Sequence, residues 1–214
     1  MVAMVTIAAI WGVAVIAFGM VITPGPNMMY LVSRSLTQGR RAGLVSLIGV
    51  VTGFTIYLLA TAAGLSLLFA AVPALFVTIK IAGAAYLLWI AVTMVRGTKS
   101  AFRADPHLPR HSTRRLYLMG LTTCLLNPKI ALMYGALLPQ FVNRGLGSTG
   151  VQLIELGLVQ VVVATVMNAC WVMLAAQVAR LLERSPRADK SVQWTAASLL
   201  TYFAIHLGLA RTAA

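Results

Sequence analysis

The stretch that decides the fold is Thr23-Pro-Gly-Pro-Asn27, which follows 22 residues that carry no charge. A membrane-spanning helix needs about 20 largely apolar residues, so these prolines fall inside or at the end of a span. Proline lacks an N–H and crowds the carbonyl four residues earlier, so we expect Pro24 and Pro26 to free the carbonyls of Met20 and Ile22. A bare carbonyl is tolerated at membrane depth only where it is buried in protein or lines a wet cavity. The stretch therefore predicts a break in the helix that is buried in protein or lines a polar cavity.

The composition is that of a membrane protein. Of 214 residues, 60% are hydrophobic and 10% are charged, whereas a soluble domain has about 25% charged residues. The net charge of +13 could indicate nucleic-acid binding, but the basic residues lie in short gaps between apolar runs. Basic residues that flank membrane spans explain this placement. We therefore expect the protein to contact membrane lipid and not to bind nucleic acid. Six runs are long enough to span: residues 2–23, 42–69, 74–95, 116–142, 153–179 and 192–209.

The basic residues also predict the orientation in the membrane. Thirteen of the 17 lie in three alternate connections: Arg34, Arg40, Arg41; Arg96, Lys99, Arg103, Arg110, Arg114, Arg115; Arg180, Arg184, Arg187, Lys190. Lys and Arg concentrate in cytoplasmic loops, so six crossings with both termini on the outer, periplasmic side are expected. If the first segment instead dips into the membrane and returns, the N-terminus is cytoplasmic.

The halves of the chain predict an internal repeat. The longest polar interval, residues 96–115, divides one transmembrane domain (residues 1–214) into repeats of about residues 1–95 and 116–214. Three crossings per repeat is an odd number, so the second repeat must be inverted, as in many secondary transporters. Each half opens with a helix that proline breaks beside an asparagine, at residues 24–27 and 127–129. The predicted fold is all-α and polytopic, with six helices in two inverted three-helix repeats.

The two breaks carry the groups that could bind a small polar molecule. Pro128 should free the carbonyl of Cys124, and a helix that restarts after the first break aims its N–H groups at an anion. Asn27 and Asn127 add amide donors and acceptors. Lys129 lies deep in the fourth apolar run, where an ionisable residue costs roughly 2.5–3.5 kcal/mol and indicates function. Ordinary proline kinks are the alternative for either break alone, but not for the matched pair.

Other polar residues in the apolar runs are weaker candidates. Lys80 and Glu155 both approach the predicted outer side, so they could pair or reach the interface. Glu155 is the single carboxylate within an apolar run, which makes it the candidate for proton coupling. Tyr86 is a candidate for lining the cavity. No His/Cys/Asp/Glu cluster with metal-ligand spacing occurs, so neither a metal nor a cofactor is expected.

Three groups of motifs resemble the LysE/RhtB family of bacterial amino-acid exporters. They are TPGPN at 23–27 with SLTQGRRAG at 35–43, KIAGAAYLLW at 80–89, and NPK at 127–129 followed by LPQF at 138–141. Their order and spacing fit over nearly the whole chain. The resemblance implies a secondary exporter of an amino acid or derivative in the bacterial cytoplasmic membrane, driven by proton entry. It implies these substrate-site residues: Pro24, Gly25, Pro26, Asn27, Asn127, Pro128, Lys129, Lys80 and Tyr86.

Two other functions are compatible with six apolar helices. A membrane thiol-redox conductor would use a cysteine near the proline of the fourth helix, here Cys124, but its partner cysteine in the first helix is missing. A passive channel or an accessory subunit would differ from a pump in lacking concentrative export. The scarcity of buried acids favours a cargo without a cationic side chain. The sequence therefore predicts a transporter rather than an enzyme, and it is compatible with a homo-oligomer.

Overall fold

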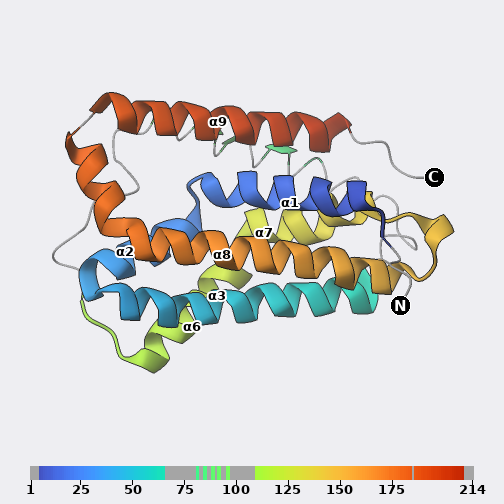
Figure 1. Ribbon diagram of the computed structural model, residues 1–214, viewed down its shortest axis with the longest axis horizontal. Coiled ribbons are helices and arrows are strands. Elements are labelled where there is room, and N and C mark those ends of the chain that lie inside the picture. Colours follow the sequence, from blue (N-terminus) through green and yellow to red (C-terminus); the bar gives the residue numbers. More distant parts are fainter. Residues whose placement is uncertain are drawn as a thin grey trace.

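The computed structural model describes residues 5–65, 109–184 and 186–209, with isolated helical positions between residues 81 and 96. Within these residues the chain is built of helices and contains no strand, which confirms the all-α prediction for this part. The long helices lie side by side, and the start of α1 (Ile7–Ile22) and the end of α9 (Pro186–Leu209) lie at the same end of the molecule (Figure 1). Six crossings in an inverted repeat stay a prediction.

The first predicted break separates α1 from α2 (Pro26–Gln38), and the two helices are bent by 52°. α1 begins after Thr6, whose Oγ1 accepts the N–H of Ala9 at 3.1 Å. α2 begins at Pro26, because a fixed φ and a missing N–H suit the first position of a helix. Together the two helices are long and apolar enough to count as one broken span or a re-entrant loop.

The second predicted break has nearly the same geometry. α6 (Thr113–Leu125) is bent by 50° from the segment Pro128–Phe141. That segment starts with α7 (Pro128–Leu132) and continues through a π-helical turn, η2 (Met133–Leu137), into a 3-10 turn, η3 (Leu138–Phe141). Both halves of the chain thus contain a bent helix pair at the place where the sequence has its proline and asparagine.

Among the described residues, two unbroken helices are long and apolar enough to cross a membrane alone, and there are up to four spans if each bent pair counts as one. The first is α3 (Arg40–Ala60), which runs on into the π-helical turn η1 (Thr61–Leu65). The second is α8 (Thr149–Arg184), which follows the short turn η4 (Arg144–Leu146). The predicted span 192–209 lies within α9, and most of the predicted span 74–95 lies outside the described residues.

Glycines let α3 and α6 approach backbone to backbone. A Cβ at Gly49 would collide with the carbonyl oxygen of Tyr117, and one at Gly120 with the carbonyl oxygen of Ser46. Small residues at such contacts are typical of helix packing in membranes. Gly53, one turn further along α3, has a similar contact, because a Cβ there would lie 2.7 Å from Cβ of Cys124, whereas a Cβ at Gly64 would meet none of the described atoms within 4 Å. This contact joins the first half of the chain to the second.

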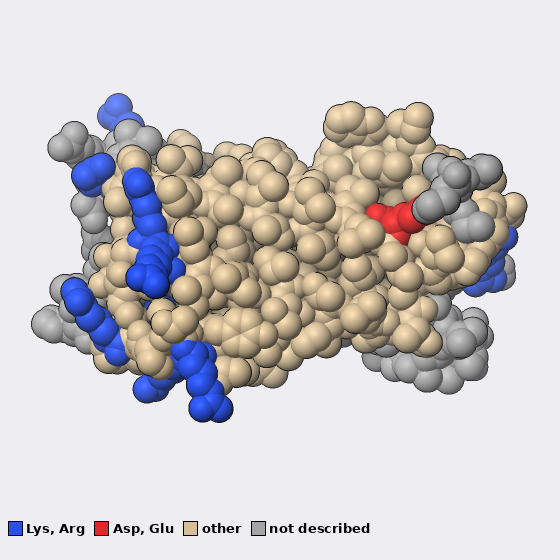
Figure 2. Space-filling model, turned by 60° about the horizontal axis from the view of Figure 1, so that its bottom comes forward, with Lys and Arg blue, Asp and Glu red and all other residues tan. Residues whose placement is uncertain are grey.

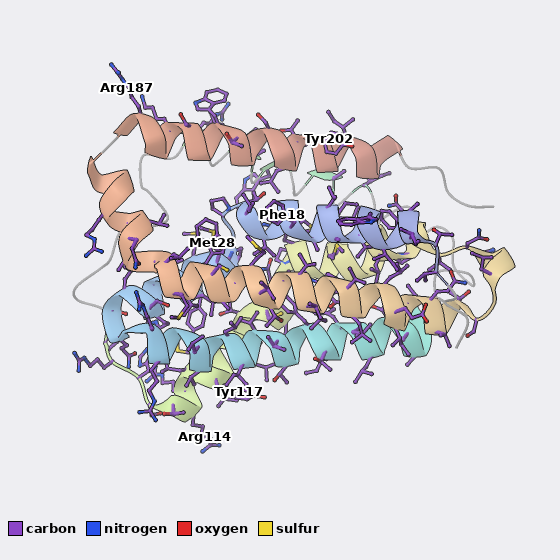
Figure 3. All side chains as sticks on the ribbon, viewed as in Figure 1. Phe18, Met28, Arg114, Tyr117, Arg187 and Tyr202 are labelled. Carbon is purple, nitrogen blue, oxygen red and sulfur yellow. The ribbon has the colours of Figure 1, made fainter. Side chains whose placement is uncertain are left out.

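Most of the basic residues gather at one end of the molecule, the basic end, and a smaller group of basic atoms lies at the other end (Figure 2). Arg114 of α6 and Arg187 of α9 both lie at the basic end, opposite the start of α1 (Figure 3). The segment before α6 is held to α2 at the same end. Arg34 donates to the carbonyl of Pro109 at 3.1 Å, and the Gln38 amide exchanges two hydrogen bonds with the backbone of His111, at 3.0 and 2.9 Å. Large apolar side chains are exposed between the two ends, as expected for a surface in contact with lipid.

Candidate functional site

The two helix breaks meet in the centre of the molecule. Nζ of Lys129, at the start of α7, donates to the carbonyl oxygen of Thr23, at the end of α1, over 2.9 Å. Lys129 is 4% exposed and Thr23 is 1% exposed, so the bond is buried. The same amine would lie 3.4 Å from a Cβ placed at Gly25, so Lys129 also packs against the backbone of the first break. The structure thus joins two residues that are 106 positions apart through a single polar contact.

The local geometry of the second break aims Lys129 inward. Pro128 occupies the first position of α7, and Asn127 caps the helix by accepting the N–H of Lys129 on Oδ1 at 3.1 Å. The N–H of Asn127 donates to the carbonyl of Cys124 at 3.1 Å. The prediction that the Cys124 carbonyl is free is therefore wrong, because the chain turns tightly enough after α6 for Asn127 to reach it.

At the first break, the carbonyl that contacts the second break is not one of the two that the prolines were predicted to free. Pro24 and Pro26 cannot donate to Met20 and Ile22, as expected, but the carbonyl that binds Lys129 is that of Thr23. The N–H and Oγ1 of Thr23 both turn back to Gly19, at 3.2 and 2.6 Å. The residue therefore stays attached to α1 while its own carbonyl leaves the helical direction.

Asn27 is a buried residue whose side-chain amide has no hydrogen-bond partner. It is 6% exposed, and neither Nδ2 nor Oδ1 makes a hydrogen bond. The thiol of Cys124, a weak hydrogen-bonding group, lies beside this amide. Burying an amide without partners costs free energy, so such a group calls for a ligand or a water molecule. Asn127 differs, because its side chain is already used as the cap of α7.

A cavity of about 30 Å³ lies between the breaks. Asn27 and Lys129 both line it, so the structure brings together the two residues that the sequence places at one site. Its apolar lining includes Met20, Phe54 and Met133. Ligand pockets usually measure about 300–1,000 Å³, so an amino acid could enter only if the walls move apart.

Long helix α8 contributes two cavity residues that the sequence analysis missed, Gln160 and Asn168. The hydroxyl of Tyr134, in η2, donates to Oε1 of Gln160. The ring of Tyr134 also stacks on Tyr57 of α3, with the ring centres 5.6 Å apart. The available signal was the spacing of eight residues between these two amides, because such a spacing places both on one side of a helix.

The remaining predicted site residues do not lie in the described part of this cavity. Lys80 and Tyr86 fall outside the described residues, so the structure does not place them. Glu155 lies on α8, half-buried and away from the cavity lining, and its Oε2 is buried without a hydrogen bond. In Figure 2 the acidic atoms lie towards the end of the molecule opposite to most of the basic ones.

The polar groups that line the cavity suit a small zwitterion, which carries one positive and one negative charge. Lys129 supplies a cation, the Thr23 carbonyl and the Asn27 amide supply acceptors, and no carboxylate is among the described residues that line the cavity. Cys124 is buried, Cys170 is exposed, and both are free thiols. Among the described residues no group of three or more His, Cys, Asp or Glu could hold a metal ion.

Comparison with known proteins gives a consistent result. A family model described as "LysE type translocator" matches residues 17–211. The uncharacterized membrane protein YrhP of Bacillus subtilis is 30% identical over 91% of this chain and 95% of its own. The threonine efflux protein of Escherichia coli K12 is 25% identical over 93% and 97%. The homoserine/homoserine lactone efflux protein of Salmonella typhimurium is 29% identical over 90% and 92%. No solved structure matches.

Proposed function

Because the chain belongs to the LysE type translocator family, we propose that it is a secondary active exporter of an amino acid or amino-acid derivative, driven by the proton gradient across the bacterial cytoplasmic membrane. The observation that carries this proposal is the buried contact between Lys129 and the Thr23 carbonyl. Both residues line one cavity together with Asn27, whose buried amide makes no hydrogen bond. Relatives named for the efflux of threonine and of homoserine support the same class of cargo.

In the proposed site, Lys129 exchanges its hydrogen bond to the Thr23 carbonyl for an ion pair with the α-carboxylate of the cargo. The first N–H groups of α2 face the break and favour an anion, because the start of a helix carries a partial positive charge. The Thr23 carbonyl, released from Lys129, then accepts a hydrogen bond from the α-ammonium group together with Oδ1 of Asn27. The exchange keeps every buried polar group paired, which is the condition for a stable bound state.

Glu155 is the proposed proton carrier. It is the one acidic residue whose side chain the structure describes, and Oε2 is buried without a hydrogen bond. Five residues separate it from the cavity residue Gln160, about 7.5 Å along the axis of α8. Movement of α8 would therefore carry both residues together.

The proposed membrane arrangement has six crossings in two inverted repeats, with both termini on the periplasmic side. The matched bends of 52° and 50° support the repeat. The basic end supports the orientation, since it lies opposite the start of α1. A simple rocking of the first half against the second is disfavoured, because the contact of Gly49 and Gly120 fixes α3 to α6 across the halves. We propose instead that the bent helices move against this fixed pair.

Export from loaded cells and uptake into inside-out vesicles test the function. Vesicles that contain the protein should accumulate at least one neutral amino acid against its gradient when acidified inside, and a protonophore should abolish the accumulation. Vesicles without the protein are the control. Equilibration without accumulation would indicate a channel and overturn the proposal of a pump. Accumulation that survives the protonophore would overturn the proposal of proton coupling alone.

A further inference from the structure

Helix α8 presents a face of its own to the cavity. Gln160, Ala164 and Asn168 are spaced by four residues, so their side chains lie along one side of the helix. A rise of 1.5 Å per residue separates the two amides by about 12 Å, with the small Ala164 between them. Gln160 and Asn168 are each 2% exposed, and both line the cavity. Since α8 packs against α1, α2 and α3, this face forms a separate wall of the site.

Both amides keep unused hydrogen-bonding capacity. Gln160 accepts from the hydroxyl of Tyr134 on Oε1, which leaves the two donors of Nε2. Asn168 donates from Nδ2 to the carbonyl of Ala164 at 2.8 Å, which leaves the acceptor Oδ1. The bonds that exist also fix the direction of each amide. In the described part of the chain, the wall thus offers the donors of Gln160 Nε2 and the acceptor Oδ1 of Asn168 beyond the groups at the breaks.

We propose that Gln160 and Asn168 select the side chain of the cargo, favouring an uncharged side chain that carries a hydroxyl or carboxamide over an apolar one of the same size. This inference rests on the proposed function, in which the helix breaks bind the α-carboxylate and α-ammonium groups. The side chain of the cargo then faces α8. An apolar side chain would displace water from the two amides and leave them unpaired, and a site built to hydrogen-bond its substrate rejects an analogue that cannot do so.

Threonine and valine are the matched probes, because they differ by a hydroxyl in place of a methyl. Loss of one buried hydrogen bond predicts that the protein exports threonine better than valine by roughly tenfold in competition. Asn168→Leu and Gln160→Met keep the side-chain volume and remove the amides, so each should bring the ratio towards one by lowering threonine export more than valine export. Gln177→Met, an exposed amide of the same helix, is the control and should keep the ratio.

A second variant keeps the shape of the site and changes its charge. Asn168→Asp should allow export of lysine, which the unmodified protein should exclude, because its carboxylate can pair with a cationic side chain. A purely structural role of either amide would lower threonine and valine export together, and an unchanged ratio in both variants would overturn the inference. Equal export of threonine and valine by the unmodified protein would also overturn it. Export of no amino acid at all would instead overturn the proposed function.

Discussion

Replacing Lys129 by methionine should abolish export while leaving the fold nearly as stable as before. The two side chains are similar in length, and Lys129 makes one hydrogen bond, to the carbonyl of Thr23 at 2.9 Å. Methionine removes the partner that the cargo carboxylate needs in the proposed site. A hydrogen bond to a charged group contributes about 1.5–3 kcal/mol, so affinity for the cargo should fall by at least roughly tenfold.

The effect on stability is the sum of two opposing changes. Removal of a deep ionisable group relieves roughly 2.5–3.5 kcal/mol of insertion cost. Leaving the Thr23 carbonyl unpaired costs about 1–3 kcal/mol. The two terms nearly cancel, and since about 1 kcal/mol moves the Tm of a chain of this size by roughly 2–4 °C, the Tm should change by a few degrees at most.

The measurement pairs two assays on the same preparation of Lys129→Met. Thermal unfolding in detergent reports the stability, and uptake of the best cargo into inside-out vesicles reports the activity. Lys129→Arg is the companion variant, since it keeps the charge but not the fit to a single carbonyl. Normal transport by Lys129→Met would refute the proposed role of the lysine. A large fall in Tm together with loss of transport would show that the lysine holds the fold and does not select the cargo.

Three further outcomes are expected. Asn27→Ala removes an amide without partners, so it should leave the Tm unchanged. It should weaken cargo binding by roughly tenfold, measured as the half-saturating concentration for uptake. Unaltered uptake would contradict the place of Asn27 in the site. Gly120→Val forces α6 away from α3 and should destabilise the protein by about 1–3 kcal/mol in thermal unfolding, whereas Gly64→Ala should not; equal stability of both would argue against the glycine contact. Glu155→Gln should still exchange labelled for unlabelled cargo but should no longer respond to an imposed pH gradient, and a retained response would assign proton coupling elsewhere.

The sequence predicts the two breaks well because their cause is local. Proline cannot donate a backbone hydrogen bond and asparagine caps a helix readily, so the bends near residues 23–27 and 127 follow from neighbouring residues alone. The burial of Lys129 follows in the same way from its depth in an apolar run. Its meeting with the first break was inferred from the repetition of the motif, and the structure brings the two breaks together.

The features that the sequence could not predict depend on the direction of single backbone groups and on contacts between helices. The carbonyl that binds the lysine is that of Thr23, because the turn after α1 rotates it out of the helical direction. Gln160 and Asn168 were not predicted, since only the packing of α8 shows which face of this helix meets the cavity. The close contact of α3 with α6 was equally hidden, because a glycine pair indicates close packing but not the partner.

The bond between Lys129 and Thr23 has a consequence for synthesis of the protein. The first break enters the membrane more than a hundred residues before the lysine that satisfies its carbonyl. Until the second half arrives, each break has a polar group without its partner, which is costly in lipid. Each half is therefore an incomplete folding unit and should be a substrate for membrane proteases when made alone. Two separate chains divided in the 96–108 segment should protect one another from degradation when they are produced together.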